Sequence, residues 1–301
     1  MRIAFLGNHT VGVRALGTLA SAVDVVAVVA HPPDPEDGVR YESVFEFAKK
    51  HGLPAIRGKP GQTHVRELLQ EASPELIWVT DYRYLLPIEL IDQARLGAVN
   101  LHPSLLPRYR GRAPVNWAIL HGESELGLTA HFIDEGMDSG DIILQAPFRL
   151  ERNEDVGDAL NKLLPIYEAV TREVIGFFEG DQIPRRKQDE SKATCFPARR
   201  PDDGQIDWDR PAEEVLNLIR AVASPYPGAF SFLDNARVRF WKACPTRREA
   251  PAQSGDVIRI ESRGPVIACG EGALVATRYD AADDKTIEIA SGKRFRWMHL
   301  P

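Results

Sequence analysis

Three polar residues near the middle of the chain have the types and spacing for proton-transfer chemistry. An apolar run over residues 97–99 is followed by Asn100 and His102. Side chains alternate along a strand, so these two would point to the same side of it. An amide N–H beside a titratable imidazole suits a reaction in which an oxyanion develops while a proton moves. Asp138 could orient that imidazole, and we predict that Asn100, His102 and Asp138 form a catalytic set.

The elements that must position these residues follow an alternating pattern. Apolar runs predict strands over 3–6, 23–30, 76–79 and 97–101, and helical spacing predicts helices over 11–19, 43–51, 65–72 and 87–94. This alternation predicts an α/β fold with a Rossmann-like, doubly wound, mainly parallel sheet. In such sheets ligands bind outside the carboxyl ends of the strands, where Asn100 and His102 would lie.

Further along, the same reasoning predicts elements around Asp138. We expect a helix over 114–121, strands over 128–133 and 141–145 that bracket the loop 134–140, and a long helix over 158–178, interrupted or kinked near Pro165. Residues 184–200 are polar and basic.

The pattern changes after Pro201, which indicates a second domain. A helix predicted over 211–223 is followed by short strands over 238–241, 257–260, 266–268 and 274–276, separated by turn residues. This pattern predicts a smaller C-terminal open β-barrel, or OB-like, domain. We expect a catalytic domain over residues 1–190, a connector over 191–204 and the β-rich domain over 205–301.

Composition restricts the class of protein and its location. The 301 residues are 44% hydrophobic and 27% charged, as in soluble globular proteins. Three widely spaced cysteines predict reduced thiols, and the short apolar N-terminus does not resemble a signal peptide. We therefore expect a cytoplasmic protein that does not bind membranes. Six other histidines lack metal-ligand spacing, so we interpret them as structural and expect no metal: His31, His51, His64, His121, His131 and His299.

The first turn, residues 7–12, invites a dinucleotide-binding interpretation that the residues do not favour. Its spacing is not G-x-G-x-x-G, and the second strand ends in His31 where an acid would hold a ribose. Two interpretations of residues 7–12 remain equally open. They form only a tight turn, or they bind a phosphate of the substrate at the helix N-terminus.

The central motifs are specific in combination. Three stretches resemble the folate-dependent formyltransferases: Asn100-Leu101-His102-Pro103-Ser104-Leu105-Leu106-Pro107, Tyr109-Arg110-Gly111-Arg112-Ala113-Pro114 and Asp138-Ser139-Gly140-Asp141. The resemblance extends over the full length, since that family also carries a small open-barrel domain. It implies formyl transfer from N10-formyltetrahydrofolate to a primary amine. His102 would accept a proton, Asp138 would orient its ring and raise its pKa, and Asn100 would donate to the oxyanion.

Local stretches indicate a branch of this family. Residues 193–204, 220–231 and 267–274 resemble the nucleotide-sugar branch, and most of all the formyltransferase domain of bifunctional enzymes that modify UDP-4-amino-4-deoxy-L-arabinose. The resemblance implies a nucleotide-linked amino sugar as the acceptor and a role in lipopolysaccharide biosynthesis and lipid A modification. The oligomeric state stays open, with a homodimer as one option.

The rival assignment is methionyl-tRNA formyltransferase. Members of that branch carry a basic, Gly-rich insertion after the second strand, whereas residues 31–38 of this chain are acidic. Phosphate contact needs Lys and Arg, so we expect no nucleic-acid partner. The basic residues 185–187 keep this rival open. A formyltetrahydrofolate hydrolase and a folate-binding module without turnover are further alternatives.

The resemblance also implies binding residues. Contacts with the folate are expected from Tyr84, Leu85, Leu86, Arg112, Asp134, Glu135, Gly136, Met137 and Asp138. An apolar and aromatic loop after the strand over 76–79 could hold a flat pteridine, or could simply cover the helix that follows it. For the nucleotide sugar, the candidates are His9, Thr10, Arg200, Asp202, Arg220 and Tyr226, because Arg suits a diphosphate and Tyr a ring face.

Overall fold

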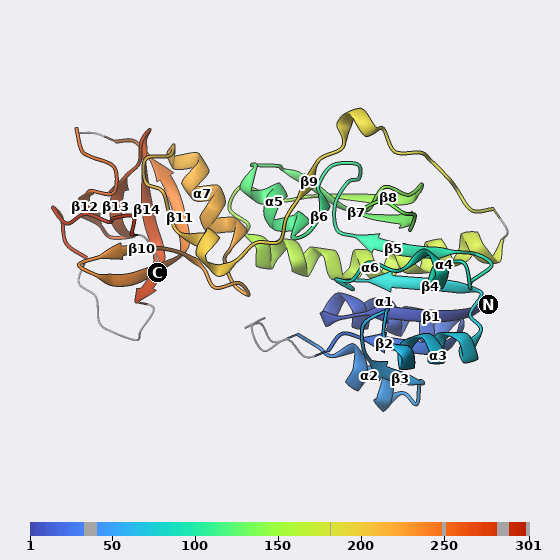
Figure 1. The fold of residues 1–301 in the computed structure, drawn as a ribbon. Helices are drawn as coiled ribbons and strands as arrows, with labels where there is room; N and C mark the ends of the chain where they lie inside the picture. Colours follow the sequence, from blue (N-terminus) through green and yellow to red (C-terminus); the bar gives the residue numbers. More distant parts are fainter. Residues whose placement is uncertain (33–40, 181, 249–250, 282–288, 299–301) are drawn as a thin grey trace. The chain divides into compact units, whose positions relative to one another are not determined.

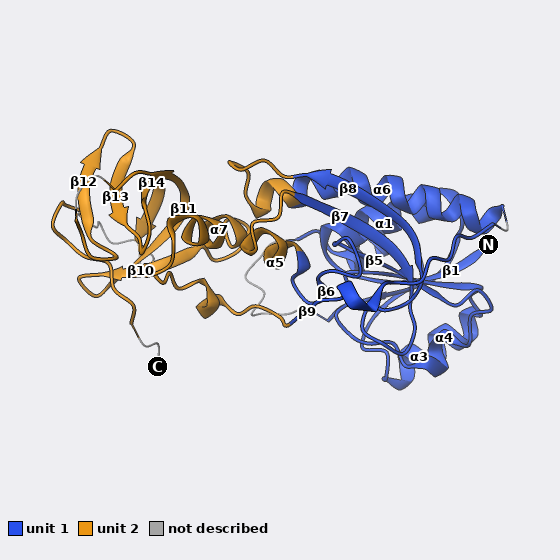
Figure 2. Ribbon diagram, turned by 90° about the horizontal axis from the view of Figure 1, so that it is seen from above, with its two compact units in different colours: residues 1–114, 125–149, 160–196 blue, residues 115–124, 150–159, 197–301 orange. Residues whose placement is uncertain are grey.

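A computed structural model describes residues 1–32, 41–180, 182–248, 251–281 and 289–298. The chain divides into two compact units, drawn in different colours in Figure 2. The first unit contains residues 1–114, 125–149 and 160–196, and the second contains residues 115–124, 150–159 and 197–301. The acidic stretch over residues 31–38, on which the prediction against a tRNA substrate depends, lies mostly outside the described residues.

The first unit is built on a seven-stranded sheet with the order β3-β2-β1-β4-β5-β7-β8 (Figure 1). The strands are β1 (Arg2–Gly7), β2 (Asp24–Ala30), β3 (Ala55–Arg57), β4 (Leu76–Thr80), β5 (Ala98–His102), β7 (Glu125–Phe132) and β8 (Ile142–Arg149). Strands β1 to β5 pair in parallel, whereas β7 and β8 are antiparallel. The predicted Rossmann-like, mainly parallel sheet is confirmed.

Helices cover both faces of this sheet. They are α1 (His9–Ala22), α2 (Val44–Lys50), α3 (Thr63–Ala72), α4 (Ile88–Ile91) and α6 (Val156–Glu179). Helices α3 and α4 pack against one face, where alternate residues such as Leu6, Val29 and Val79 form a buried cluster. Figure 2 shows α1 and the long helix α6 on the opposite face. The sheet is therefore covered on both sides, which explains its continuous apolar strands.

Local sequence signals account for several helix boundaries. Helix α2 begins after Ser43, whose hydroxyl accepts a hydrogen bond from the backbone N–H of Glu46 at 3.3 Å. This N-cap satisfies one of the free donors of the first turn. Gly52 follows the helix with φ of 69°, a left-handed conformation that favours glycine after a helix end.

Of the two predicted alternatives near Pro165, an interruption or a kink, the interruption is excluded, because α6 runs through this residue as one 24-residue helix. A proline in a helix removes one backbone donor and crowds the preceding turn. Leu163 and Tyr167 are both almost fully buried on either side of it. Burial of an apolar face stabilises a helix more than single-residue propensity does.

The second unit is built on a five-stranded antiparallel sheet with the order β10-β11-β14-β13-β12. The strands are β10 (Ala229–Leu233), β11 (Ala236–Thr246), β12 (Val257–Glu261), β13 (Gly264–Ala268) and β14 (Ala273–Ala281), and the helices are α5 (Pro114–Leu120) and α7 (Ala212–Ala221). The two edge strands do not pair with each other. Instead Arg296 forms a bridge with Phe232 of β10, and Arg294 forms one with Asp256. The predicted separate β-rich domain is confirmed.

Two insertions from the first half of the chain contribute to the second unit. The Asn116 amide donates to the carbonyl of Ala221 at 2.7 Å. The Arg220 guanidinium donates to the carbonyls of Glu154 at 2.7 Å and Glu151 at 3.2 Å. Residues 115–124 and 150–159 thus pack with α7, so the second unit is assembled from three stretches of sequence. Within the described part of the chain, no helix combines the length and apolar character needed to cross a bilayer.

Candidate active site

The register of the sheet places the predicted catalytic residues at one edge. Thr80 of β4 pairs with Leu101 of β5, so His102 lies at the carboxyl end of the parallel strands. The antiparallel strand β7 lies on the other side of β5, with His131 opposite Asn100 and Thr129 opposite His102. Side chains at opposite positions of paired strands share a face. Four polar residues therefore gather on one side of β5 and β7.

The ring of His102 is oriented by a backbone carbonyl. Its Nε2 lies 2.8 Å from the oxygen of Tyr109, and a carbonyl can only accept, so Nε2 carries the proton. Its Nδ1 lies 3.6 Å from Oδ2 of Asp138. The neutral ring thus turns its unprotonated nitrogen toward the carboxylate. The imidazole is only 5% exposed.

Asp138 raises the pKa of His102, as expected, but the net shift of this pKa is downward. Burial lowers this pKa, and its effect exceeds the opposing effects of the Asp138 carboxylate and the Tyr109 carbonyl. His131 lowers the pKa slightly further. Desolvation disfavours the charged form of an imidazole, so His102 is neutral at pH 7 and able to accept a proton.

Asp138 is held in a strained backbone conformation by several contacts. Its φ is 52°, in the left-handed region that non-glycine residues rarely adopt. Its Oδ2 accepts a hydrogen bond from the backbone N–H of Gly111 at 2.9 Å. Burial alone would raise the pKa of the carboxyl, but His102, His131 and this N–H outweigh it and hold the pKa well below its ordinary value. The carboxylate is therefore charged at every physiological pH.

Asn100 and His131 complete the cluster, although we had interpreted His131 as structural. His131 Nδ1 lies 2.7 Å from the carbonyl of Phe132, so its Nε2 is free of hydrogen and accepts from the Asn100 amide at 3.2 Å. The second amide hydrogen of Asn100 points to Asp138 Oδ1 at 3.4 Å. Both contacts are long, so this donor can turn to a substrate oxygen at little cost.

A signal for His131 was present in the sequence. His131 and Thr129 are polar residues at alternate positions of a strand that is otherwise apolar after Glu125, and both are buried. Polar alternation within a buried strand indicates a polar site on one of its faces. Only the antiparallel pairing with β5 shows that this face is the one bearing Asn100 and His102.

Hydrogen bonds from side chains within the loop stabilise the conformation of residues 134–140. Asp134 Oδ1 accepts from the backbone N–H of Gly136 at 3.0 Å and from the Ser139 hydroxyl at 2.7 Å. A Cβ on Gly140 would lie 1.9 Å from the carbonyl oxygen of Phe132, so only glycine fits there. Glu135 and Met137 are exposed, and the Met137 sulfur lies 3.7 Å from that of Cys195.

The other predicted folate loop has one exposed and two packed side chains. Leu85 is 75% exposed, whereas Tyr84 and Leu86 pack against the buried cluster beneath α3 and α4. The Tyr84 ring stacks on His31, with the ring centres 4.7 Å apart and the planes at 5°. His31 Nε2 is buried and has no hydrogen-bond partner among the described residues. Arg112, also predicted to be near the folate, is exposed, and its backbone N–H donates to Phe196.

Of the predicted acceptor-binding residues, His9 and Thr10 lie in the first unit. Gly7 pairs with Thr80, so the turn after β1 lies beside the turn after β4. There His9 Nδ1 lies 2.6 Å from Oδ2 of Asp81, and both residues have left-handed backbones with φ of 55° and 53°. Strained residues of this kind concentrate at functional sites. Sequence reasoning missed Asp81, because nothing in the sequence pairs it with His9.

Arg200, Asp202, Arg220 and Tyr226 belong to the second unit. Arg220 is buried and its guanidinium donates to backbone carbonyls and to Asn217, so its role in this unit is to anchor residues 151–154. Arg200 lines a cavity of about 920 Å³ in this unit, together with Trp117 and Arg199. Asp202 is exposed and Tyr226 is half-buried.

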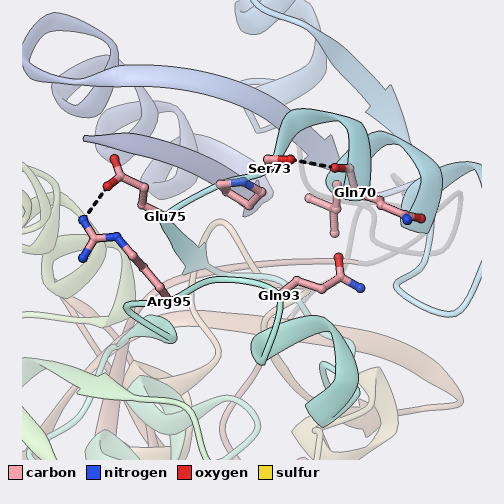
Figure 3. Close-up of a pocket in the computed structure, with 7 residues that line it drawn as sticks. Gln70, Ser73, Glu75, Gln93 and Arg95 are labelled. Carbon is pink, nitrogen blue, oxygen red and sulfur yellow. Dashed lines mark hydrogen bonds and ion pairs between the residues drawn. The ribbon is translucent and has the colours of Figure 1, made fainter.

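A smaller cavity of about 400 Å³ lies at the opposite end of the strands in the first unit. Figure 3 shows two of its lining side chains, Glu75 and Arg95, which form an ion pair. Glu75 precedes β4 and Arg95 precedes β5. None of the described residues that line it is a histidine or a cysteine. Its residues therefore offer no proton-transfer chemistry like that of Asn100, His102 and Asp138.

Comparison with known proteins identifies the class that this fold and site define. Residues 1–175 match the family described as formyl transferase, and residues 199–294 match the formyl transferase C-terminal domain. The chain therefore belongs to the formyl transferase family.

Solved structures share this fold at low sequence identity. WlaRD, described as a sugar 3N-formyl transferase in the presence of dTDP and 5-N-formyl-THF, is 20% identical with a TM-score of 0.70, over 93% of this chain and 97% of its own. An N-formyltransferase from Helicobacter canadensis, in complex with folinic acid and dTDP-3-aminofucose, is 21% identical with a TM-score of 0.71, over 91% and 98%. Methionyl-tRNA formyltransferase from Clostridium thermocellum is 18% identical with a TM-score of 0.57, over 82% and 94%.

Proposed function

We propose that this chain transfers the formyl group of N10-formyltetrahydrofolate to the primary amine of a nucleotide-linked amino sugar. The observation that carries the proposal is the convergence of Asn100, His102 and Asp138 at the carboxyl end of β5, in a chain of the formyl transferase family. The descriptions of two similar structures name a formylated folate together with dTDP or a dTDP-linked amino sugar. They support both the donor and the acceptor class.

The proposed reaction needs a base that is neutral at working pH. The amine nitrogen bonds to the formyl carbon, the C=O π electrons move to oxygen, and a proton must leave the nitrogen. Nδ1 of His102 is the unprotonated nitrogen, and it faces Asp138 at 3.6 Å. Asp138 then stabilises the imidazolium as it forms. Collapse of the intermediate breaks the bond to N10 of the folate, and His102 returns the proton to N10.

Asn100 is the proposed donor to the oxyanion. Its amide hydrogens are engaged only in the long contacts to His131 and Asp138. When an oxyanion forms beside β5, one of these hydrogens turns to it, which adds a charge-assisted bond in the transition state. Loss of such a donor typically raises the barrier by about 3 kcal/mol.

The proposed folate site lies between the loops 84–86 and 134–138. Leu85 and Met137, one on each loop, are exposed apolar side chains at 75% and 46%. A flat heteroaromatic ring would cover such side chains, and backbone groups of irregular loops can bind its polar edge. The predicted contacts of Tyr84, Leu86, Arg112, Asp134, Glu135 and Gly136 remain part of this proposal.

For the acceptor, we place His9, Thr10 and Asp81 near the reacting amine. The register of β1, β4 and β5 puts the turns after these strands side by side. The Asp81 side chain is 43% exposed, and only its Oδ2 is engaged with His9. A carboxylate there can accept hydrogen bonds from sugar hydroxyls or the amine. Arg200, Asp202 and Tyr226 remain candidates for nucleotide contacts.

The particular sugar is a finer proposal. We favour UDP-4-amino-4-deoxy-L-arabinose or a similar 4-amino sugar, because residues 193–204, 220–231 and 267–274 resemble the enzymes that modify this sugar. A role in lipid A modification and a homodimeric state remain predictions. The alternative is methionyl-tRNA formyltransferase, the activity in the description of one similar structure.

A substrate panel tests the assignment. The protein is incubated with N10-formyltetrahydrofolate and UDP-, GDP- or dTDP-linked amino sugars, or with Met-tRNA, and the products are identified by mass spectrometry. We expect a formylated nucleotide sugar. Product from Met-tRNA alone would establish the alternative, and formate without a formylated amine would indicate a hydrolase.

Substitution of the base tests the site itself. We expect His102→Ala to lower kcat by about 10²–10⁴-fold, the usual contribution of a general base. His51→Ala, which changes an exposed histidine at the end of α2, is the matched control and should leave kcat unchanged. Full turnover by His102→Ala would refute the catalytic assignment.

A further inference from the structure

The segment that follows α6 runs along the proposed catalytic site, and we call residues 184–196 the strap. Arg186 of the strap exchanges two backbone hydrogen bonds with Ile142 at the start of β8, at 2.8 and 2.9 Å. Further on, β9 (Cys195–Phe196) pairs with β6 (Arg110–Gly111). The strap is therefore attached to the strand that follows the loop carrying Asp138 and to β6, whose Gly111 N–H donates to Asp138.

Gln188 joins the strap directly to that loop. Its Nε2 donates to the carbonyls of Asp138 and Gly140, each at 2.8 Å. Its Oε1 accepts from Arg110, from Nη2 at 2.8 Å and Nε at 3.2 Å. Two carbonyls on one side and a guanidinium on the other leave only one orientation for this amide. All its strong hydrogen-bonding groups are satisfied.

Glu190 fixes the other side of Arg110. The carboxylate binds the guanidinium at two points, 2.8 Å from Nη1 and 2.6 Å from Nη2. The Arg110 side chain is only 10% exposed, and Glu190 is the carboxylate that pairs with it. A bidentate pair fixes both distance and orientation.

Arg110 lies between two backbone groups of the catalytic site. The carbonyl of the preceding residue, Tyr109, holds Nε2 of His102, and the N–H of the following residue, Gly111, donates to Asp138. Tyr109 and Asp138, neither of which is a glycine, have positive φ of 62° and 52°. Such conformations persist only when surrounding contacts fix them.

We propose that Arg110, Gln188 and Glu190 are positioning residues, which hold the Asp138 carboxylate and the Tyr109 carbonyl in place around His102. The catalytic importance of these three residues rests on the proposed function. Their effect on the positions of Asp138 and Tyr109 can be tested in the protein without substrate. At metal sites, removal of the groups that bind the metal ligands typically changes activity by about 10–100-fold, and we expect an effect of the same order here.

Gln188→Met tests the inference, since it keeps the length of the side chain and removes its hydrogen-bonding groups without adding charge. We expect kcat to fall by about tenfold or more with little change in the KM of either substrate. Asp189→Asn is the matched control, because among the described residues the Asp189 carboxylate binds Ser191 and Lys192 of the same turn and neither Arg110 nor the loop that carries Asp138. It should leave kcat unchanged. Unchanged kcat in Gln188→Met would overturn the proposal.

A second measurement separates positioning from general loss of structure and needs no substrate. The titration of His102 is followed by NMR of protein labelled in its histidine rings. Asp138, His131 and the Tyr109 carbonyl face this ring, and Asp138 raises its pKa. If Gln188→Met lets Asp138 move away, the midpoint falls below that of the wild type and toward that of Asp138→Asn. An unchanged midpoint in a folded variant would contradict the proposal.

A milder variant keeps the test decisive if Gln188→Met does not fold. Glu190→Gln retains hydrogen-bonding groups for Arg110 and removes the charge, so its effects on kcat and on the titration should be smaller and in the same direction. If the wild type transfers no formyl group, the proposed function fails while the titration still decides the positioning role. A wild-type midpoint in folded Glu190→Gln and Gln188→Met would refute it.

Discussion

At the scale of single residues, burial decides how His102 works. A carboxylate 3.6 Å from an imidazole would by itself favour the protonated ring. Here the ring is almost fully buried, and desolvation lowers its pKa below 6.5 in spite of Asp138. The residue is thus neutral before reaction, and the carboxylate stabilises the charge that appears during it. Two opposing effects give a base that is available at neutral pH.

This balance predicts the pH dependence of turnover. Protonated His102 cannot accept a proton, so kcat should fall as the pH drops through the lowered pKa of His102, below 6.5. Asp138→Asn removes the group that raises this pKa. The fall in kcat should therefore move to lower pH, while the maximum decreases because the imidazolium loses its partner. Measuring kcat against pH at saturating concentrations of one acceptor tests both effects.

A neighbouring carboxylate provides the control for this experiment. Asp141 lies after the same loop and faces Arg185 at 3.9 Å, not His102. Asp141→Asn should leave the pH profile at its wild-type position. A profile that moves to higher pH in Asp138→Asn would contradict the charge arrangement described here.

At the scale of elements, the long helix α6 contains an uncompensated polar group. Thr171 is fully buried, and its hydroxyl has no hydrogen-bond partner among the described residues. A buried hydroxyl without a partner costs free energy. We therefore expect Thr171→Val, which has nearly the same shape, to raise the free energy of unfolding by about 1 kcal/mol, measured by urea denaturation.

A second threonine gives the opposite expectation for the same substitution. The Thr129 hydroxyl in β7 donates to Ser104 at 2.6 Å and accepts from Leu106 at 3.2 Å and Gln145 at 3.0 Å. Thr129→Val leaves these groups unpaired and should lower the free energy of unfolding by about 2 kcal/mol. Equal effects of the two substitutions would show that hydrogen bonding of the hydroxyl does not decide the outcome.

At the scale of the whole molecule, the second unit does not coincide with one stretch of sequence. Residues 115–124 and 150–159 belong to the first half of the chain in sequence, but they pack with α7 in the second unit. We predict that a fragment of residues 197–301 unfolds at a lower urea concentration than the same unit in the full chain, because it lacks these contacts. Tryptophan fluorescence follows the transition, since Trp208 is buried in this unit.

The control for the fragment is a substitution in the full chain. Arg220→Met removes the donors to the carbonyls of Glu151 and Glu154 and keeps much of the apolar stem. It should reproduce part of the loss seen in the fragment. A fragment that unfolds at the same midpoint as the full chain would show that the two inserted segments add no stability.

Features that depend on neighbouring residues were predictable from the amino-acid sequence. Strand periodicity placed Asn100 and His102 on one side of β5, and the alternation of strands and helices predicted the Rossmann-like sheet and the separate β-rich domain. These features depend on neighbours along the chain, which is why they can be read from it. The continuation of α6 through Pro165 depends instead on packing of its apolar face, which is not local and outweighs the effect of the proline.

Only the tertiary structure decided how the site is assembled. His131 joins it through an antiparallel pairing, and Gln188 and Glu190 reach it from the strap, far away in sequence. The sign of the pKa shift of His102 was likewise undecided, because the sequence names the charged neighbour but not the burial. Desolvation sums over everything that surrounds a group, and those surroundings exist only once the chain has folded.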